Sequence, residues 1–208
     1  MKLVTFVLLG ILLLCVFPAV ADPPPRDSEV VIGFTGGSTW TSESTGTCIW
    51  YFPVLGDLDL GSLFATDVSG NPVIDKKHSY LIWVSDWSVQ AVFGNAPFTL
   101  AVVPSGTATI YYSNNPTSRD WHDLSDRRTW GVPVAQFVRG AGLLQTTDNW
   151  ASGKFYFSAP LVSSKAFSVS GKRFNFSDLI PNGMTCFEDG QAGSTSEAGS
   201  CIAIGKGH

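Results

Sequence analysis

The amino-acid sequence predicts an all-β protein, built as a single-domain antiparallel β-sandwich or β-barrel with one short helical turn near residues 121–128. Short apolar or alternating runs recur about every eight to twelve residues between turn residues, a rhythm typical of both architectures. The composition of 21 Gly, 12 Pro, 7 Trp and 14 Phe favours turns and half-buried pleated surfaces. No alternation of strand and helix patterns indicates a parallel sheet.

The first 21 residues have the features of a secretory signal peptide. Lys2 precedes an apolar stretch at 3–16, and small residues end the segment before Asp22. The stretch is shorter than the roughly 20 residues that span a bilayer. We therefore expect a secreted protein, extracellular or periplasmic, with no membrane insertion after signal cleavage.

The mature chain is expected to begin with an extended Pro-rich leader at 22–29, because proline keeps this segment out of a helix. One folded domain then occupies 30–208. Its expected strands lie at about Val30–Phe34, Cys48–Val54, Ser62–Val68, Ser79–Trp87, Ala91–Phe93, Phe98–Val103, Thr107–Tyr112, Val132–Arg139, Gly153–Phe157, Ala166–Ser170, Arg173–Phe176 and Cys201–Ile204.

The most specific local prediction is a hairpin around Gly171-Lys172. With these two residues as the loop, Val169 faces Phe174 and Phe167 faces Phe176, so all the apolar side chains share one face. For the helical turn at 121–128, Asp120 is placed to cap the first turn. A second short turn is possible at 176–180.

Three cysteines follow the signal peptide: Cys48, Cys186 and Cys201. In an oxidising compartment, Cys186 and Cys201 are the favoured pair, closing a Gly/Ser-rich loop at 187–200 and stabilising it by about 3 kcal/mol on the chain-entropy model. Three single pairings remain possible on sequence grounds. Cys48 is then buried or free for an intermolecular bond.

Charge limits the classes of partner. The formal net charge is −4 and the sequence pI is about 5.2, which disfavours nucleic acid and anionic membranes because both attract basic surfaces. A small molecule or a glycan is the expected partner, and the sequence does not indicate an oligomeric state.

The densest polar cluster, at 118–130, holds the weak catalytic candidates. His122 can act as a general base oriented by Asp120 or Asp123, which would make a hydrolase or isomerase. The alternative is a solvated turn with no chemistry, since charge runs usually face water. No Gly-x-Ser-x-Gly motif marks a nucleophilic serine.

Metal and carboxylate chemistry have little support. Asp57 and Asp59 are weak candidates for a calcium site, but the segment lacks an EF-hand pattern. The four glutamates, at 29, 43, 188 and 197, lie in polar, loop-like contexts, and no pair of them is selected for glycoside hydrolysis. We expect no cofactor.

The tryptophans indicate binding. Trp83 and Trp87 lie on the same face of an extended strand, about 13 Å apart, and Trp121 and Trp130 lie in loop-like segments. We expect a non-catalytic protein that recognises a glycan or other neutral ligand through exposed aromatic side chains, ahead of an apolar ligand enclosed in a barrel. Trp83 can instead be a core residue, because its strand is apolar on both faces. A structural or adhesive surface protein that uses strand edges is a third possibility.

Overall fold

The computed structural model describes residues 30–204, except for 43, 57–59, 148–151 and 192–195. The signal peptide and leader predicted before residue 30, and the acidic pair Asp57 and Asp59, lie outside the described residues. The all-β prediction is confirmed, because strands make up most of the described chain. No helix in this part of the chain is long and apolar enough to cross a membrane.

The strands and helices follow one another in a simple order. The strands are β1 (Val30–Trp40), β2 (Thr45–Leu55), β3 (Leu81–Ser88), β4 (Ala91–Asn95), β5 (Phe98–Val103), β6 (Gly106–Tyr112), β7 (Val132–Arg139), β8 (Gly142–Thr147), β9 (Ser152–Ala159), β10 (Leu161–Ser164), β11 (Phe167–Val169), β12 (Lys172–Phe174), β13 (Met184–Gln191) and β14 (Glu197–Ala203). The helical segments are single turns: the 3-10 helices η1 (Leu60–Ser62) and η2 (Pro116–Ser118), and the α-helix α1 (Phe176–Leu179).

The main sheet closes into a barrel. Its twelve strands have the order β10-β7-β6-β3-β2-β1-β14-β13-β9-β8-β5-β4, and every pairing is antiparallel. Four consecutive pairs of strands are separated only by short breaks: β3 and β4, β5 and β6, β7 and β8, and β9 and β10. Across each break the chain continues along the next pair, since β3 pairs with β6 and β4 with β5, β6 with β7 and β5 with β8, and β7 with β10 and β8 with β9. Each pair is therefore one long bent strand.

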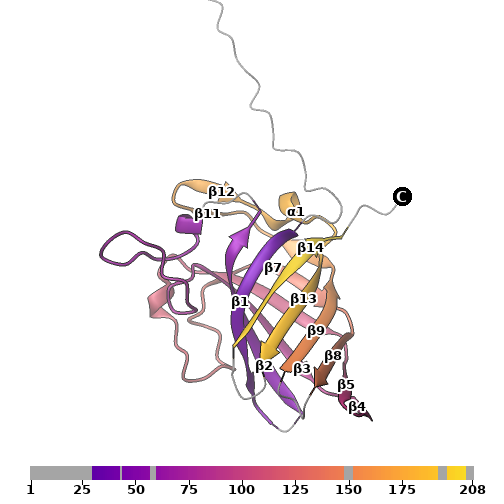
Figure 1. Cartoon of the computed structure of the whole chain (residues 1–208). Coiled ribbons are helices and arrows are strands. Elements are labelled where there is room, and N and C mark those ends of the chain that lie inside the picture. Colours follow the sequence, from indigo (N-terminus) through magenta and orange to yellow (C-terminus); the bar gives the residue numbers. More distant parts are fainter. Residues whose placement is uncertain (1–29, 43, 57–59, 148–151, 192–195, 205–208) are drawn as a thin grey trace, which may run out of the picture.

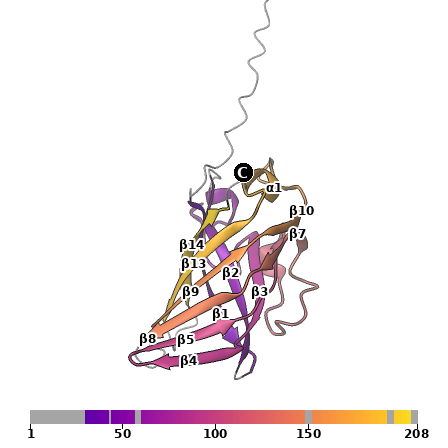
Figure 2. The same cartoon turned by 90° about the vertical axis from the view of Figure 1, so that its right-hand side faces the viewer.

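Counted in this way, eight long strands run up and down in sequence order, and the last, β14, pairs with the first, β1. Two backbone hydrogen bonds continue the pairing across the bend between β9 and β10: Val138 donates to Pro160 at 3.1 Å and Gly140 to Ser158 at 2.6 Å. Figures 1 and 2 show the wall that results, with β1, β14, β13 and β9 side by side. Between the two predicted architectures, these pairings favour the barrel.

One end of the barrel is filled by apolar side chains. The β11–β12 hairpin and α1 lie at this end (Figure 1), and Phe167 and Phe176 are buried there with ring centroids 5.9 Å apart. Phe176 also meets Phe137 of β7 edge to face, at 6.5 Å. The short turn anticipated at 176–180 is therefore present as α1, and its side chains pack into the core.

The β11–β12 hairpin differs in register from its prediction. Phe167 pairs with Phe174 and Val169 with Lys172, so the loop is Ser170-Gly171, and both loop residues have the positive φ of a type I′ turn. The predicted register is wrong by two residues. Because side chains alternate with a period of two, the apolar residues keep their common face.

The predicted helix at 121–128 is wrong, and three aspartates give the reason. Side-chain oxygens of Asp120, Asp123 and Asp126 each accept a hydrogen bond from the backbone N–H two residues later, at 2.9, 2.9 and 3.1 Å. Such local bonds compete with the i to i−4 bonds of a helix. The segment instead packs Trp130 onto the outer side of the sheet, against Ile82 and its neighbours.

The disulfide between Cys186 and Cys201 is confirmed, but its surroundings are not the predicted loop. The two residues lie directly opposite one another on β13 and β14, and the strands pair from Met184 to Gly190 on one side and from Glu197 to Ala203 on the other. Most of 187–200 is therefore a β-hairpin on the barrel wall. Cys48 is buried as a free thiol.

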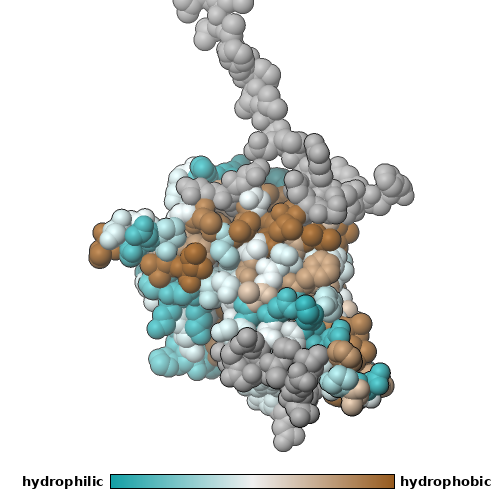
Figure 3. Space-filling model, in the orientation of Figure 1, coloured by the Kyte–Doolittle hydropathy of each residue, from teal (hydrophilic) through white to brown (hydrophobic). Residues whose placement is uncertain are grey.

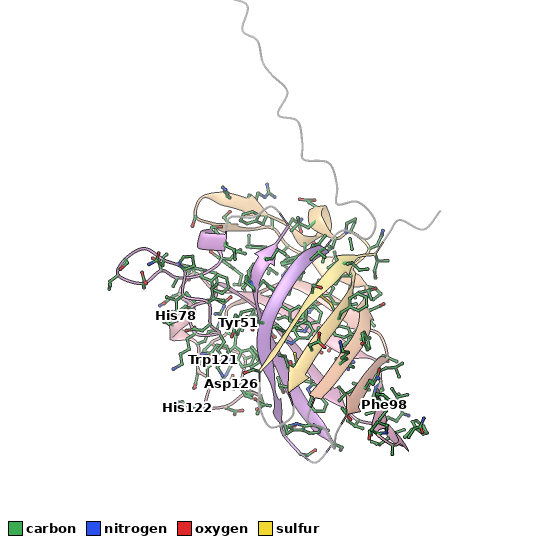
Figure 4. All side chains as sticks on the ribbon, in the orientation of Figure 1. Tyr51, His78, Phe98, Trp121, His122 and Asp126 are labelled. Atoms are coloured by element: carbon green, nitrogen blue, oxygen red, sulfur yellow. A yellow bond between two sulfur atoms is a disulfide. The ribbon has the colours of Figure 1, made fainter. Side chains whose placement is uncertain are left out.

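The edge strand β4 has an unusually apolar outer surface. Phe93 of β4 is 59% exposed, and Phe98 and Leu143 of the adjoining strands are also exposed. β4 and β5 lie at the lower right of Figure 1, where Figure 3 shows an apolar region and Figure 4 labels Phe98. An edge of this kind is the feature that a structural or adhesive role would use.

An aromatic cavity inside the barrel as the candidate functional site

A cavity of about 980 Å³ lies inside the barrel, lined by side chains from ten of its strands. It opens at the end where β1 finishes, because the lining includes Trp40, which is 52% exposed, and the exposed residues Ser42 and Ser44. The opposite end of β1 lies beside α1: Gly56 donates to Val31, and a side chain at Gly56 would touch α1. The cavity therefore has one apolar floor and one mouth.

The walls and floor are mainly aromatic. Trp50 and Trp83 stack with ring centroids 5.4 Å apart, and Phe157 lies 5.7 Å from Trp50 and 6.3 Å from Trp83. At the mouth, Trp40 meets Trp87 edge to face at 4.4 Å. Alternation along the strands places these rings inside, because every second residue of a barrel strand faces inward.

A buried guanidinium stands on one side of the cavity. Arg139, at the end of β7, is 2% exposed; its Nε donates to Ser85 Oγ at 3.2 Å and its Nη2 to the Pro104 carbonyl at 2.9 Å. Gly106 lies opposite Arg139 on β6 and leaves room for it, since a Cβ there would lie 3.0 Å from Nη2. Burial lowers the pKa of Arg139. Among the described residues, its Nη1 has no hydrogen-bond partner.

Two carboxyl groups stand at another part of the wall. Glu188 of β13 is buried, and its pKa is raised well above the ordinary value by burial, by the charge of Glu197 and by a hydrogen bond to it. Glu197 Oε2 accepts from Trp50 Nε1 at 3.1 Å and from Cys48 Sγ at 3.7 Å. Burial, followed by the charge of Glu197, also raises the pKa of Cys48, so this thiol is a poor nucleophile at neutral pH.

The four tryptophans expected to bind ligand divide into two groups. Trp83 and Trp87 line the cavity, but Trp83 is fully buried, as the alternative interpretation of its strand required. Trp130 is also fully buried, and Trp121 packs against it at 5.2 Å on the outer side of the sheet. Trp83 and Trp130 are therefore not exposed as the sequence led us to expect, because the strand that carries Trp83 is covered on both sides and Trp130 packs against Ile82.

The weak catalytic candidates lie outside the cavity. Figure 4 shows His122 on the outer side of the sheet, beside Trp121. His122 is exposed, and the hydrogen bonds of Asp120 and Asp123 go to backbone N–H groups and to the Ser125 hydroxyl. In the described part of the chain, no three His, Cys, Asp or Glu residues are placed to hold a metal.

Sequence reasoning did not find Arg139, Glu188 or Glu197 as site residues. The available signal was alternation: Arg139 ends a predicted strand, and Glu188 lies two residues after Cys186, on the same face of an extended chain. Comparison with protein-family models, with curated proteins and with solved structures gives no match for this chain.

Proposed function

We propose that the protein is a secreted, non-catalytic binding protein that holds a small ligand with a flat apolar body inside the barrel. The observation that carries this proposal is the cavity of about 980 Å³ with its aromatic floor of Trp50, Trp83 and Phe157. Eight-stranded barrels can enclose one small ligand. Ligand pockets are mostly apolar, with a few polar groups that fix orientation.

The chemistry of the wall supports binding over catalysis. The Cys48 thiol has a raised pKa, whereas a catalytic cysteine needs a lowered one. Glu188 and Glu197 share a hydrogen bond, while glycosidases hold their two carboxyl groups roughly 5 Å or more apart, with the scissile bond between them. The disulfide supports an oxidising compartment, as secretion requires.

A neutral fluorescent probe tests whether the cavity accepts a ligand. N-phenyl-1-naphthylamine brightens in apolar surroundings, and we expect saturable binding with one site per chain. Leu144 lines the cavity and is only half-buried, so Leu144→Trp places a large side chain in the ligand's space. We expect this variant to weaken binding at least about tenfold, which corresponds to about 1.4 kcal/mol.

Leu143→Trp is the matched control. Leu143 is the preceding residue on β8 but points outward, where it is 46% exposed. This variant adds the same side chain to the apolar outer surface and should leave probe binding unchanged. If Leu144→Trp binds as the unmodified protein does, or if Leu143→Trp alone weakens binding, the probe binds outside the cavity and the proposal is wrong.

A further inference from the structure

We propose that the cavity selects an organic anion, a carboxylate or sulfonate carried on a flat apolar body, whose charged group is held by Arg139, with the indole N–H groups of Trp83 and Trp87 as further donors on the same face of β3. This inference rests on the proposed function, since it assumes that the ligand enters the barrel. It goes further by naming the chemical class of the ligand and the residues that recognise it.

The first argument is that the unpaired polar atoms of the cavity wall are hydrogen-bond donors. Four buried polar atoms of its lining residues have no partner within the described chain: Trp83 Nε1, Trp87 Nε1, Arg139 Nη1 and Thr146 Oγ1. The two indoles and the guanidinium can only donate, and the hydroxyl can donate as well. An unpaired buried donor is costly, so a ligand that brings an acceptor to one of them gains free energy.

The second argument is that three of these donors come from neighbouring positions. Trp83, Ser85 and Trp87 are alternate residues of β3 and face the same side of the sheet. The Arg139 guanidinium donates to Ser85 Oγ at 3.2 Å, which places it beside the residue between the two indoles. An anionic group near Ser85 would therefore lie beside the guanidinium, on the face of β3 that also carries the two indoles.

The third argument is charge. Arg139 is buried, and among the described ion pairs none involves it. A buried charge without a counter-charge is strongly unfavourable. An anion at this position therefore gains more binding free energy than a neutral acceptor does. Charge-assisted hydrogen bonds to a guanidinium are also stronger than neutral ones.

The carboxyl groups of the cavity wall favour an organic cation less than Arg139 favours an anion. Glu197 already accepts from Trp50 and Cys48, and Glu188 shares a hydrogen bond with Glu197. The protein thus supplies donors to its own acidic pair, whereas the guanidinium keeps an unused N–H group. A cationic ligand would have to replace contacts that already exist.

Three naphthalenes that differ only in their polar group test the inference. Isothermal titration of the full protein at neutral pH would compare naphthalene-1-carboxylate, naphthalene-1-carboxamide and 1-naphthylmethylammonium. We expect the carboxylate to bind about ten- to a hundredfold more tightly than the amide, as hydrogen bonds to a charged group allow, and the ammonium most weakly. A carboxylate that binds no better than the amide, or an ammonium that binds best, would overturn the inference.

Variants then assign the effect to Arg139. Arg139→Met removes the charge at similar length, so the preference for the carboxylate over the amide should disappear. Arg128→Met is the matched control, because Arg128 is exposed and paired with Asp126 outside the cavity. An Arg139→Met protein that folds, as judged by circular dichroism, and keeps the preference for the carboxylate would contradict the assignment.

The comparison of the three ligands needs no variant, so it decides the question even if Arg139→Met does not fold. It also separates the two proposals. If N-phenyl-1-naphthylamine binds in the cavity and the carboxylate has no advantage, only the inference about the anion is wrong. If neither the neutral probe nor any of the three naphthalenes binds, the proposed function is wrong as well.

Discussion

Glu188 is expected to make the stability of the barrel depend on pH. Burial, the charge of Glu197 and the hydrogen bond to it raise the pKa of Glu188 in the folded protein, whereas an unfolded glutamate titrates near about 4.3. Between these two pKa values the folded state binds more protons than the unfolded state. The free energy of unfolding therefore falls as pH rises through this window and levels off above the folded pKa.

The size of the effect is set by the difference between the folded and unfolded pKa values of Glu188. A tenfold change in proton affinity on folding corresponds to about 1.4 kcal/mol of stability that is present at low pH and lost above the folded pKa. Glu188→Gln keeps the shape of the side chain and a hydrogen-bond donor for Glu197 but cannot ionise. We expect the variant to match the unmodified protein near pH 4 and to be more stable at pH 8, by about 1.4 kcal/mol for each tenfold change in proton affinity on folding.

Urea unfolding followed by tryptophan fluorescence, at intervals from pH 4 to pH 8.5, measures the difference. Asp189→Asn is the control, because Asp189 is the next residue on β13, points outward and pairs with Lys154 at 3.1 Å with its side chain 73% exposed. This variant should keep most of the pH dependence of the unmodified protein in that window, because the charge of Asp189 is the smallest of the causes that raise the pKa of Glu188. If Glu188→Gln keeps it too, the carboxyl group does not titrate as described and the reasoning fails.

Two further changes test the disulfide in the barrel wall and the cap of α1. Replacing Cys186 and Cys201 together by alanine should lower the free energy of unfolding by about 3 kcal/mol, the chain-entropy value for a bond whose ends are 15 residues apart; an unchanged urea midpoint would contradict it. Asn175→Ala should cost about 1 kcal/mol, because the Asn175 side chain caps α1 by accepting from the Ser177 N–H at 3.3 Å; calorimetry should show a lower Tm, and an unaltered Tm would argue against the cap.

The sequence predicted those parts of the fold that depend on local chemistry. The all-β class followed from composition and spacing. The disulfide followed from the closeness of Cys186 and Cys201 along the chain. In the β11–β12 hairpin, the face of each side chain was predicted correctly although the register was not. Side chains alternate between the two faces of a strand, so a shift of two residues returns each one to the same face.

The cavity could not be predicted, because it depends on which strands close the barrel. Arg139 and Glu197 are 58 positions apart in sequence and contribute to one cavity only through the pairing of β14 with β1 and the bend between β9 and β10. Glu188 was assigned to a loop because the segment after it is rich in Gly and Ser. A strand there requires the pairing partners on both sides of β13, and no local pattern reveals them.

The first and last described strands begin and finish at the closed end of the barrel, away from its mouth. β1 starts and β14 finishes at the end where α1 lies, whereas the mouth with Trp40 lies at the other end of β1. A resin, a sensor chip or a fusion partner joined near Val30 or Ala203 would therefore be kept away from the opening. Immobilised protein of this kind would present every mouth to the flowing sample, so surface-based assays can report the capture of ligand without blockage by the attachment.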